Sequence, residues 1–290
     1  MIWSGGVIDP DDALAVSVAD RTFEHGLGLF ETLRTWVGRP SLLGRHKARM
    51  LRSAEALGLL VDPQTWPDEA AVRMLLDAEG FDGDRMLRVT ATGGTASGRS
   101  VVWMRSSPLP PPIRDGGAVV CINASASPFP LGEGDGNAPS DFTARHKTLN
   151  YWFKRVAHER ARALGYDETL IHLDPWGLAE GSRSNLFLVI DGRLVTPSTV
   201  APIVPGILRG LTIEAAEALA IETLEVAALA QNQLEAASEI FLTNAVRGII
   251  PVARVDTSDS SIVRPAPGPV TIRLQLEIDR RLHLAPKDVP

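Results

Sequence analysis

The chain is poor in the residues on which several classes of protein depend. Its 290 residues include a single cysteine, Cys121, and six scattered histidines. One thiol cannot form an internal disulfide, and no group of Cys and His has the spacing of a metal site. Cys121 lies in an apolar, strand-like stretch, so we expect a buried and unreactive thiol. The sequence therefore predicts neither an internal disulfide nor a bound metal.

Long runs of one kind of residue are also missing. The net charge is −6, and the 29 Lys and Arg residues form no run of the length found in nucleic-acid-binding arms. No apolar run is long enough to span a membrane. The first residues lack the basic and then apolar segments of a signal peptide. We therefore expect a cytoplasmic protein with no nucleic-acid or membrane partner.

What remains is the composition of an ordinary folded protein, with 44% hydrophobic and 22% charged residues. A chain of this length is long for one core, so two domains are expected. Strand-like and helix-like segments alternate, which favours a mixed α/β (α+β) fold. Residues 125–140 are rich in Pro, Gly, Asp and Asn, as in a loop or linker. We predict an N-terminal α/β domain over 1–120, a linker over 121–140 and a C-terminal, cofactor-binding domain over 141–290.

Hydrophobic periodicity places most of the secondary structure. Strand-like patterns occur at 14–18, 28–37, 86–90, 101–104, 117–123, 169–173, 185–190, 194–195 and 239–242. Helical spacing occurs at 45–58, 68–79, 149–164, 208–219 and 227–236.

Two segments carry groups that belong to one chemistry. Lys147 stands at the opening of the helix predicted over 149–164, and Glu180 stands just before the strand predicted at 185. A lysine can form a Schiff base with an aldehyde cofactor, and a carboxylate can keep a heterocyclic nitrogen protonated. Each residue alone is usually an ordinary surface group. Together they indicate pyridoxal phosphate, which needs both.

A phosphate group is bound well at a helix N-terminus that is preceded by small residues. Gly206 allows close approach there, and the amides of Ile207 and Leu208 open the next helix. A plain strand-to-helix turn explains the same residues. Arg49 is a candidate cation for the phosphate, because a guanidinium binds it with two parallel hydrogen bonds. Composition alone leaves four candidates: Arg45, Lys47, Arg49 and Arg52.

Five segments, in this order, resemble the fold-type IV pyridoxal-phosphate enzymes, also called class IV aminotransferases. They cover 20–34, 145–151, 180–187, 205–207 and 241–245, and the resemblance extends over about residues 2–256. The family includes branched-chain and D-amino acid aminotransferases, R-selective amine transaminases and 4-amino-4-deoxychorismate lyase. The resemblance implies a small N-terminal and a larger C-terminal domain with the cofactor between them, and a homodimer.

The resemblance also implies roles for single residues. Lys147 matches the Schiff-base lysine, Glu180 the carboxylate on the pyridine nitrogen, and Arg49 the phosphate-binding arginine. The amides of Ile207 and Leu208 match the family's phosphate cup. Tyr151 is similar to the phenol that meets the cofactor's ring oxygen, although it follows the lysine by four residues rather than five. Further positions near cofactor or substrate are Asn244, Ala245 and Phe30.

Departures from the family pattern bear on the reaction. Leu208 stands where the aminotransferases usually have threonine, and Asn244 with Ala245 resembles the lyase. Against the lyase, Thr92 stands where that enzyme often has arginine. Arg99 could bind a substrate carboxylate or be solvated, and Arg183 could be a second carboxylate anchor or lie at the dimer interface.

These patterns predict an enzyme that acts on a small amino substrate. The leading prediction is a 4-amino-4-deoxychorismate lyase, which releases pyruvate and 4-aminobenzoate. The alternative is an aminotransferase for branched-chain or D-amino acids with a 2-oxo acid acceptor. A third reading is a family member that binds pyridoxal phosphate without turnover, although Lys147, Glu180 and Arg49 are all present. Fold alone cannot choose between the reactions.

Overall fold

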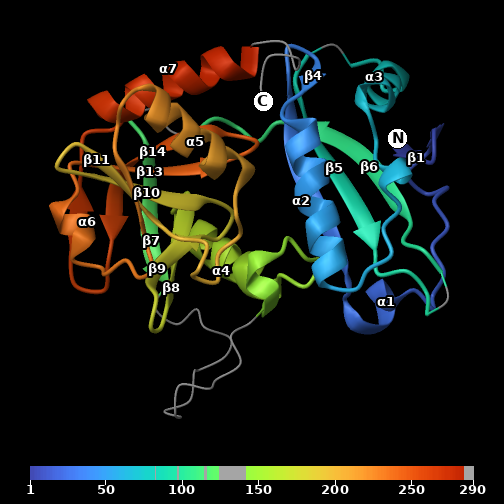
Figure 1. The fold of residues 1–290 in the computed structure, drawn as a ribbon, viewed down its shortest axis with the longest axis horizontal. Coiled ribbons are helices and arrows are strands. Elements are labelled where there is room, and N and C mark those ends of the chain that lie inside the picture. The colour runs from blue at the N-terminus through green and yellow to red at the C-terminus, as the bar shows by residue number, and fades with distance from the viewer. Residues whose placement is uncertain (82, 97, 114–115, 124–141, 284–290) are drawn as a thin grey trace. The chain divides into compact units, whose positions relative to one another are not determined.

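The computed structural model describes residues 1–81, 83–96, 98–113, 116–123 and 142–283 (Figure 1). The linker predicted over 121–140 lies outside the described residues from 124 onward. The described chain forms two compact units. The first contains residues 1–111 and 146–150, with 282–283, and the second contains 112–123, 142–145 and 151–281.

The first unit is built on one antiparallel sheet whose described strands run in the order β2-β1-β6-β5-β3-β4. The strands are β1 (Ile2–Ser4), β2 (Val7–Asp9), β3 (Gly28–Trp36), β4 (Arg39–Pro40), β5 (Arg85–Thr92) and β6 (Val102–Pro108). The helices are α1 (Arg21–His25), α2 (Leu43–Ala56), α3 (Glu69–Ala78) and a 3-10 turn at Pro63–Thr65. Every second residue of a strand faces the helices, so Leu33 and Leu87 share a core with Met50 of α2 and Leu75 of α3.

An extended segment around Lys147 lies beside β3 in this unit. The amide of Phe30 donates to the carbonyl of Lys147 (2.9 Å), and the amide of Leu149 donates to the carbonyl of Gly28 (3.0 Å). Leu29 and Thr148 form the antiparallel bridge between these bonds. Gly28 is required there, because a Cβ atom on it would lie 2.7 Å from the Leu149 side chain.

This pairing corrects the predicted start of the following helix. Helix α4 covers Trp152–Ala163 and begins three residues later than the predicted 149. The backbone groups of residues 147–149 bond to β3, so they cannot open a helix. Lys147 therefore lies on a strand-like segment. That segment groups with the first unit, although the sequence places it in the domain predicted to begin at 141.

The second unit contains a mixed sheet in the described order β12-β11-β10-β13-β14-β7-β8-β9, with β15 on β14. Its strands are β7 (Ala118–Asn123), β8 (Glu168–Leu173), β9 (Gly177–Gly181), β10 (Asn185–Ile190), β11 (Arg193–Pro197), β12 (Thr223–Val226), β13 (Glu239–Asn244), β14 (Gly248–Asp256) and β15 (Ser261–Val263). Its helices are α4, α5 (Ile207–Ala218), α6 (Gln233–Ala236) and α7 (Pro269–His283), with a 3-10 turn at Phe142–Arg145. The strands β10 and β13 meet at the core, where the rings of Phe187 and Phe241 stack with centroids 5.0 Å apart.

Several predicted elements differ from the observed ones. Residues 14–18, all described, form no strand, and Val18 is largely exposed, so this alternation has no sheet to cover. The helix predicted over 227–236 is the shorter α6. The sequence patterns missed the strand β14 and the helix α7.

Candidate functional site

The first unit buries a carboxylate between two basic side chains. Glu31 lies on β3 on the same side as Leu33, facing α2, where His46 and Arg49 are three residues apart on one face. Arg49 donates to Glu31 through Nε at 2.8 Å and Nη2 at 2.5 Å. The Nδ1 atom of His46 lies 2.7 Å from Glu31 Oε2. All three side chains are buried, so the predicted phosphate ligand Arg49 is held in a fixed orientation.

Burial and charge act in opposite directions on this cluster. Burial opposes the ionisation of Glu31, but Arg49 and His46 lower its pKa to about 2. Burial lowers the pKa of His46, and the charges of Arg49 and Lys147 add to that effect. Near neutral pH the cluster therefore contains a carboxylate, a guanidinium and a neutral imidazole. The imidazole Nδ1–H donates to Glu31, and its buried Nε2 has no hydrogen-bond partner.

Two cations gather at the ring of Phe30 on the opposite side of the same sheet. The Nζ atom of Lys147 lies 4.4 Å from the ring centroid, and the guanidinium carbon of Arg88 lies 3.8 Å from it. Arg88 stands opposite Thr32 in β5, so it projects from the same sheet face as Phe30. Cation–π attraction of this kind orders both groups. Arg88 was not predicted from the sequence, because strand periodicity shows which residues share a face of one strand but not which strand lies next to it.

Arg99, one of the two arginines predicted to bind the substrate, is in a different setting. Its side chain is 72% exposed, and its Nη1 forms an ion pair with Asp62. The structure thus brings Lys147 together with Phe30, and it gives Arg99 a partner at the surface.

The second unit buries the other predicted carboxylate, Glu180, in strand β9. Its Oε2 accepts from the backbone amide of Val204 (3.2 Å) and from Nδ2 of Asn185 (3.4 Å). Its Oε1 accepts from Nζ of Lys154 at 2.5 Å. Asn185 also donates to the carbonyl of Val204 (2.9 Å). Glu180 is thereby tied to the turn that leads into α5.

That turn has the properties of an anion site. Helix α5 begins after Gly206, which caps it without a side-chain hydrogen bond. A Cβ atom on Gly206 would lie 2.0 Å from Oδ1 of Asn185, so only glycine fits. The amides of Ile207 and Leu208 are in the first turn, where no carbonyl of the helix can accept from them. The Leu208 side chain is buried, and the helix start has no hydroxyl at that position.

The turn that follows β13 and Tyr151 also lie in the second unit. Asn244 ends β13, and its Oδ1 accepts from the amides of Val246 (3.0 Å) and Arg247 (2.8 Å), which fixes the turn that contains Ala245. The neighbouring Thr243 has a buried hydroxyl without a hydrogen-bond partner. Tyr151 is half-buried at the N-cap of α4, one residue before the helix.

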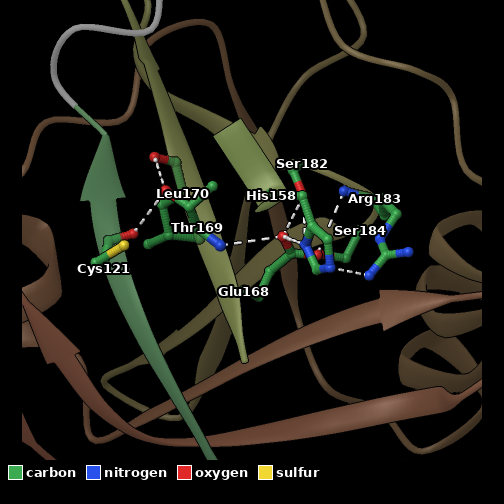
Figure 2. A network of polar contacts seen from close by, with 8 residues as sticks. All are labelled: Cys121, His158, Glu168, Thr169, Leu170, Ser182, Arg183 and Ser184. Carbon is green, nitrogen blue, oxygen red and sulfur yellow. Dashed lines mark hydrogen bonds and ion pairs between the residues drawn. The ribbon is translucent and has the colours of Figure 1, made fainter. Parts of the chain in front are cut away.

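A third buried carboxylate organises the segment between Glu180 and Asn185. Figure 2 shows Glu168 at the centre of this network. Glu168 accepts from the Ser182 hydroxyl, the Ser184 hydroxyl (3.2 Å) and the Arg183 amide (3.3 Å), while Nδ1 of His158 lies 3.3 Å away. Burial opposes its ionisation, but the bonds from His158 and Ser182 lower its pKa. The Arg183 guanidinium contacts Nε2 of His158. The network that holds Arg183 was not predicted from the sequence.

The described residues contain neither a metal-binding cluster nor a membrane-spanning helix. No three His, Cys, Asp or Glu side chains in this part of the chain lie close enough together to hold a metal ion. None of its helices is both long and apolar enough to cross a membrane. Cys121 is half-buried rather than fully buried as predicted, and burial raises the pKa of its thiol, which disfavours the reactive thiolate.

Comparisons with known proteins identify the family of this chain. A relative from Methanocaldococcus jannaschii, named as a branched-chain-amino-acid aminotransferase, is 29% identical over 263 residues, which are 87% of this chain and 86% of the relative. The branched-chain aminotransferase of Thermoproteus uzoniensis has a similar structure, with a TM-score of 0.82, 25% identity and coverage of 97% of this chain and 94% of the other. A Legionella pneumophila protein assigned as a 4-amino-4-deoxychorismate lyase shares the fold, with a TM-score of 0.78, 22% identity and coverage of 94% and 97%. The family model of amino-transferase class IV matches residues 28–255. The chain therefore belongs to the class IV aminotransferases, which are pyridoxal-phosphate-dependent enzymes.

Proposed function

We propose that this protein is an aminotransferase that moves an amino group between a small amino acid and a 2-oxo acid. The observation that carries the proposal is the pair of cations at the Phe30 ring. Lys147 supplies an amine for the cofactor's aldehyde, and Arg88 supplies a guanidinium that attracts the carboxylate which amino and oxo acids share. The relative and the structure that align over most of their length at 25–29% identity carry aminotransferase names.

The residues present fit pyridoxal phosphate. Gly206 leaves the space beside Asn185 that a side chain would fill, and the amides of Ile207 and Leu208 are available to an anion. The family resemblance assigns a further phosphate contact to Arg49 of the first unit, and Glu31 holds that side chain in a fixed orientation. Glu180 is a buried acceptor for a protonated ring nitrogen. When bound, the cofactor provides a ring that takes up the electron pair released at the substrate's α-carbon.

The chain's own groups have separate tasks in this proposal. Lys147 holds the cofactor and then, as a free amine, takes the proton from the substrate's α-carbon. The negative charge of Glu180 favours the protonated form of the ring nitrogen. Arg88 orients the substrate by its carboxylate, and Asn244 keeps the Ala245 turn in place through its two backbone hydrogen bonds.

A second candidate is 4-amino-4-deoxychorismate lyase, and the residues around the anion site favour it. Leu208 offers no hydroxyl at the start of α5, and the residue pair Asn244 and Ala245 resembles the pair that the lyase has at these positions. In that reaction the enolpyruvyl group leaves as pyruvate and the ring becomes 4-aminobenzoate.

One experiment separates the two reactions. The cofactor-loaded protein is incubated with aminodeoxychorismate alone, and in parallel with L-leucine or D-alanine plus 2-oxoglutarate. Glutamate formation that requires the oxo acid supports the aminotransferase. Pyruvate release from aminodeoxychorismate without an oxo acid, and no glutamate from either amino acid, would establish the lyase instead. Lys147→Ala is the control for both reactions.

A further inference from the structure

Lys154 lies in the first turn of α4 and reaches the carboxylate that the cofactor requires. Its Nζ donates to Oε1 of Glu180 at 2.5 Å. The Lys154 side chain is 19% exposed, whereas that of Glu180 is 5% exposed. His158 stands four residues later on the same face of α4 and contacts Glu168 in the same way. The helix therefore presents one basic group to each of two buried carboxylates.

The two ends of this ion pair differ in how firmly they are held. Glu180 is fixed through Oε2 by the Val204 amide and by Asn185. Lys154 is at the end of a long flexible side chain with access to water. A buried carboxylate is costly without a positive partner, so the Lys154 ammonium stabilises the ionised form of Glu180.

We infer that Lys154 occupies the place of the cofactor's ring nitrogen at Glu180. In the protein without cofactor, the Lys154 ammonium neutralises the carboxylate. In the loaded protein, Glu180 accepts from the protonated ring nitrogen instead, and Lys154 turns out to solvent. The inference rests on the role proposed for Glu180. Lys154 then lowers the affinity for the cofactor, because the hydrogen bond from Lys154 to Glu180 must break before the ring nitrogen can donate to Glu180.

Binding of two probes tests the exchange. The first probe is pyridoxamine 5′-phosphate, which has no aldehyde and so binds without a bond to Lys147. The second is its analogue with C–H in place of the ring nitrogen. In Lys154→Met we expect the first probe to bind about tenfold more tightly, the factor that corresponds to one hydrogen bond of about 1.4 kcal/mol. The analogue must also displace Lys154, so it should gain the same factor in Lys154→Met. Because it makes no bond to Glu180, it should bind less tightly than the first probe to both proteins.

Matched variants make the result specific. Lys154→Arg keeps the charge and should bind both probes as the unchanged protein does. Arg155→Met, at the next position of the same helix, removes an exposed cation paired with Glu159 and should change neither affinity. The thermal midpoint of the cofactor-free protein should fall in Lys154→Met and stay unchanged in Lys154→Arg.

The outcomes separate this inference from the function on which it rests. In Glu180→Gln the preference for the probe with the ring nitrogen should disappear. If the preference persists, the role of Glu180 is wrong. A second outcome is that the preference disappears in Glu180→Gln while Lys154→Met leaves the affinity for both probes unchanged or weakens both equally. In that case the exchange is overturned, and Lys154 is only a structural partner of Glu180.

Discussion

Each unit of the molecule buries a predicted functional group in an ion pair, but the two pairs are built differently. Glu31 of the first unit receives two nitrogens of Arg49 and one of His46, and all three side chains are buried. Glu180 of the second unit receives one ammonium, from the partly exposed Lys154. A bidentate, buried guanidinium is fixed, whereas a single ammonium near water can be exchanged.

The difference indicates two kinds of task. Where the cation is the functional group, as proposed for Arg49, the carboxylate serves to hold it. Where the carboxylate is the functional group, as proposed for Glu180, the cation neutralises it only until the cofactor binds. The four predictions below test this contrast, beginning with the largest effect.

The largest effect should come from Lys147, which belongs to the same unit as the first pair. Lys147→Ala removes both the amine for the cofactor and the base for the α-carbon, so turnover should fall by at least about 10³–10⁴-fold. The visible absorbance of the bound cofactor should change as well. Steady-state rates and an absorption spectrum check both. A variant that keeps a tenth of the rate would remove Lys147 from the reaction.

The fixed pair should dominate the stability of the protein. Glu31→Gln leaves Arg49 and His46 buried without a carboxylate, and we expect a loss of about 3–5 kcal/mol in the free energy of unfolding. The pKa of Glu31 is lowered by its partners to about 2 from 4.5. Its contribution is therefore complete above about pH 4.5 and is lost as the pH falls toward 2.

Urea unfolding between pH 7 and pH 2.5 measures this contribution. The difference in stability between the protein and Glu31→Gln should shrink as the pH falls below about 4.5. A difference that stays constant over this range would show that Glu31 is not ionised in the fold.

The sequence predicted the residues with a chemical signature better than their partners. Lys147 and Glu180 stand in motifs whose residue types and order resemble the family, and that resemblance then selected Arg49 from four neighbouring cations. The partners were not predicted because strand register and helix packing bring them together, and hydrophobic periodicity does not show which strands or helices become neighbours. These partners are Arg88, Lys154, His46 and Glu31. The start of α4 was wrong for a similar reason: the helical pattern from 149 is real, but the backbone of 147–149 bonds to β3. Strand β14 contains Pro251, which weakened its pattern.

The exchangeable pair should affect turnover more than stability. Glu180→Gln keeps the size of the side chain and one acceptor oxygen but removes its charge, so the ring nitrogen loses the group that favours its protonation. Turnover should fall by about two powers of ten, which corresponds to ~3 kcal/mol from one electrostatic contact. The variant should still bind the cofactor. Rates at saturating substrate, with absorbance to confirm loading, provide the measurement, and near-normal turnover would make this carboxylate structural.

The smallest effect should come from an exposed ion pair of the first unit, which contrasts with the buried one. Arg99 pairs with Asp62 through a side chain that is 72% exposed. Because solvent screens such a pair, Arg99→Ala should change the free energy of unfolding by less than about 1 kcal/mol. Its effect on KM decides between the two readings of Arg99. An unchanged KM for the amino acid, in a variant of unchanged stability, makes Arg99 a solvated surface group. A KM that rises about tenfold with kcat unchanged would assign the substrate carboxylate to Arg99, since that pattern marks the loss of binding alone.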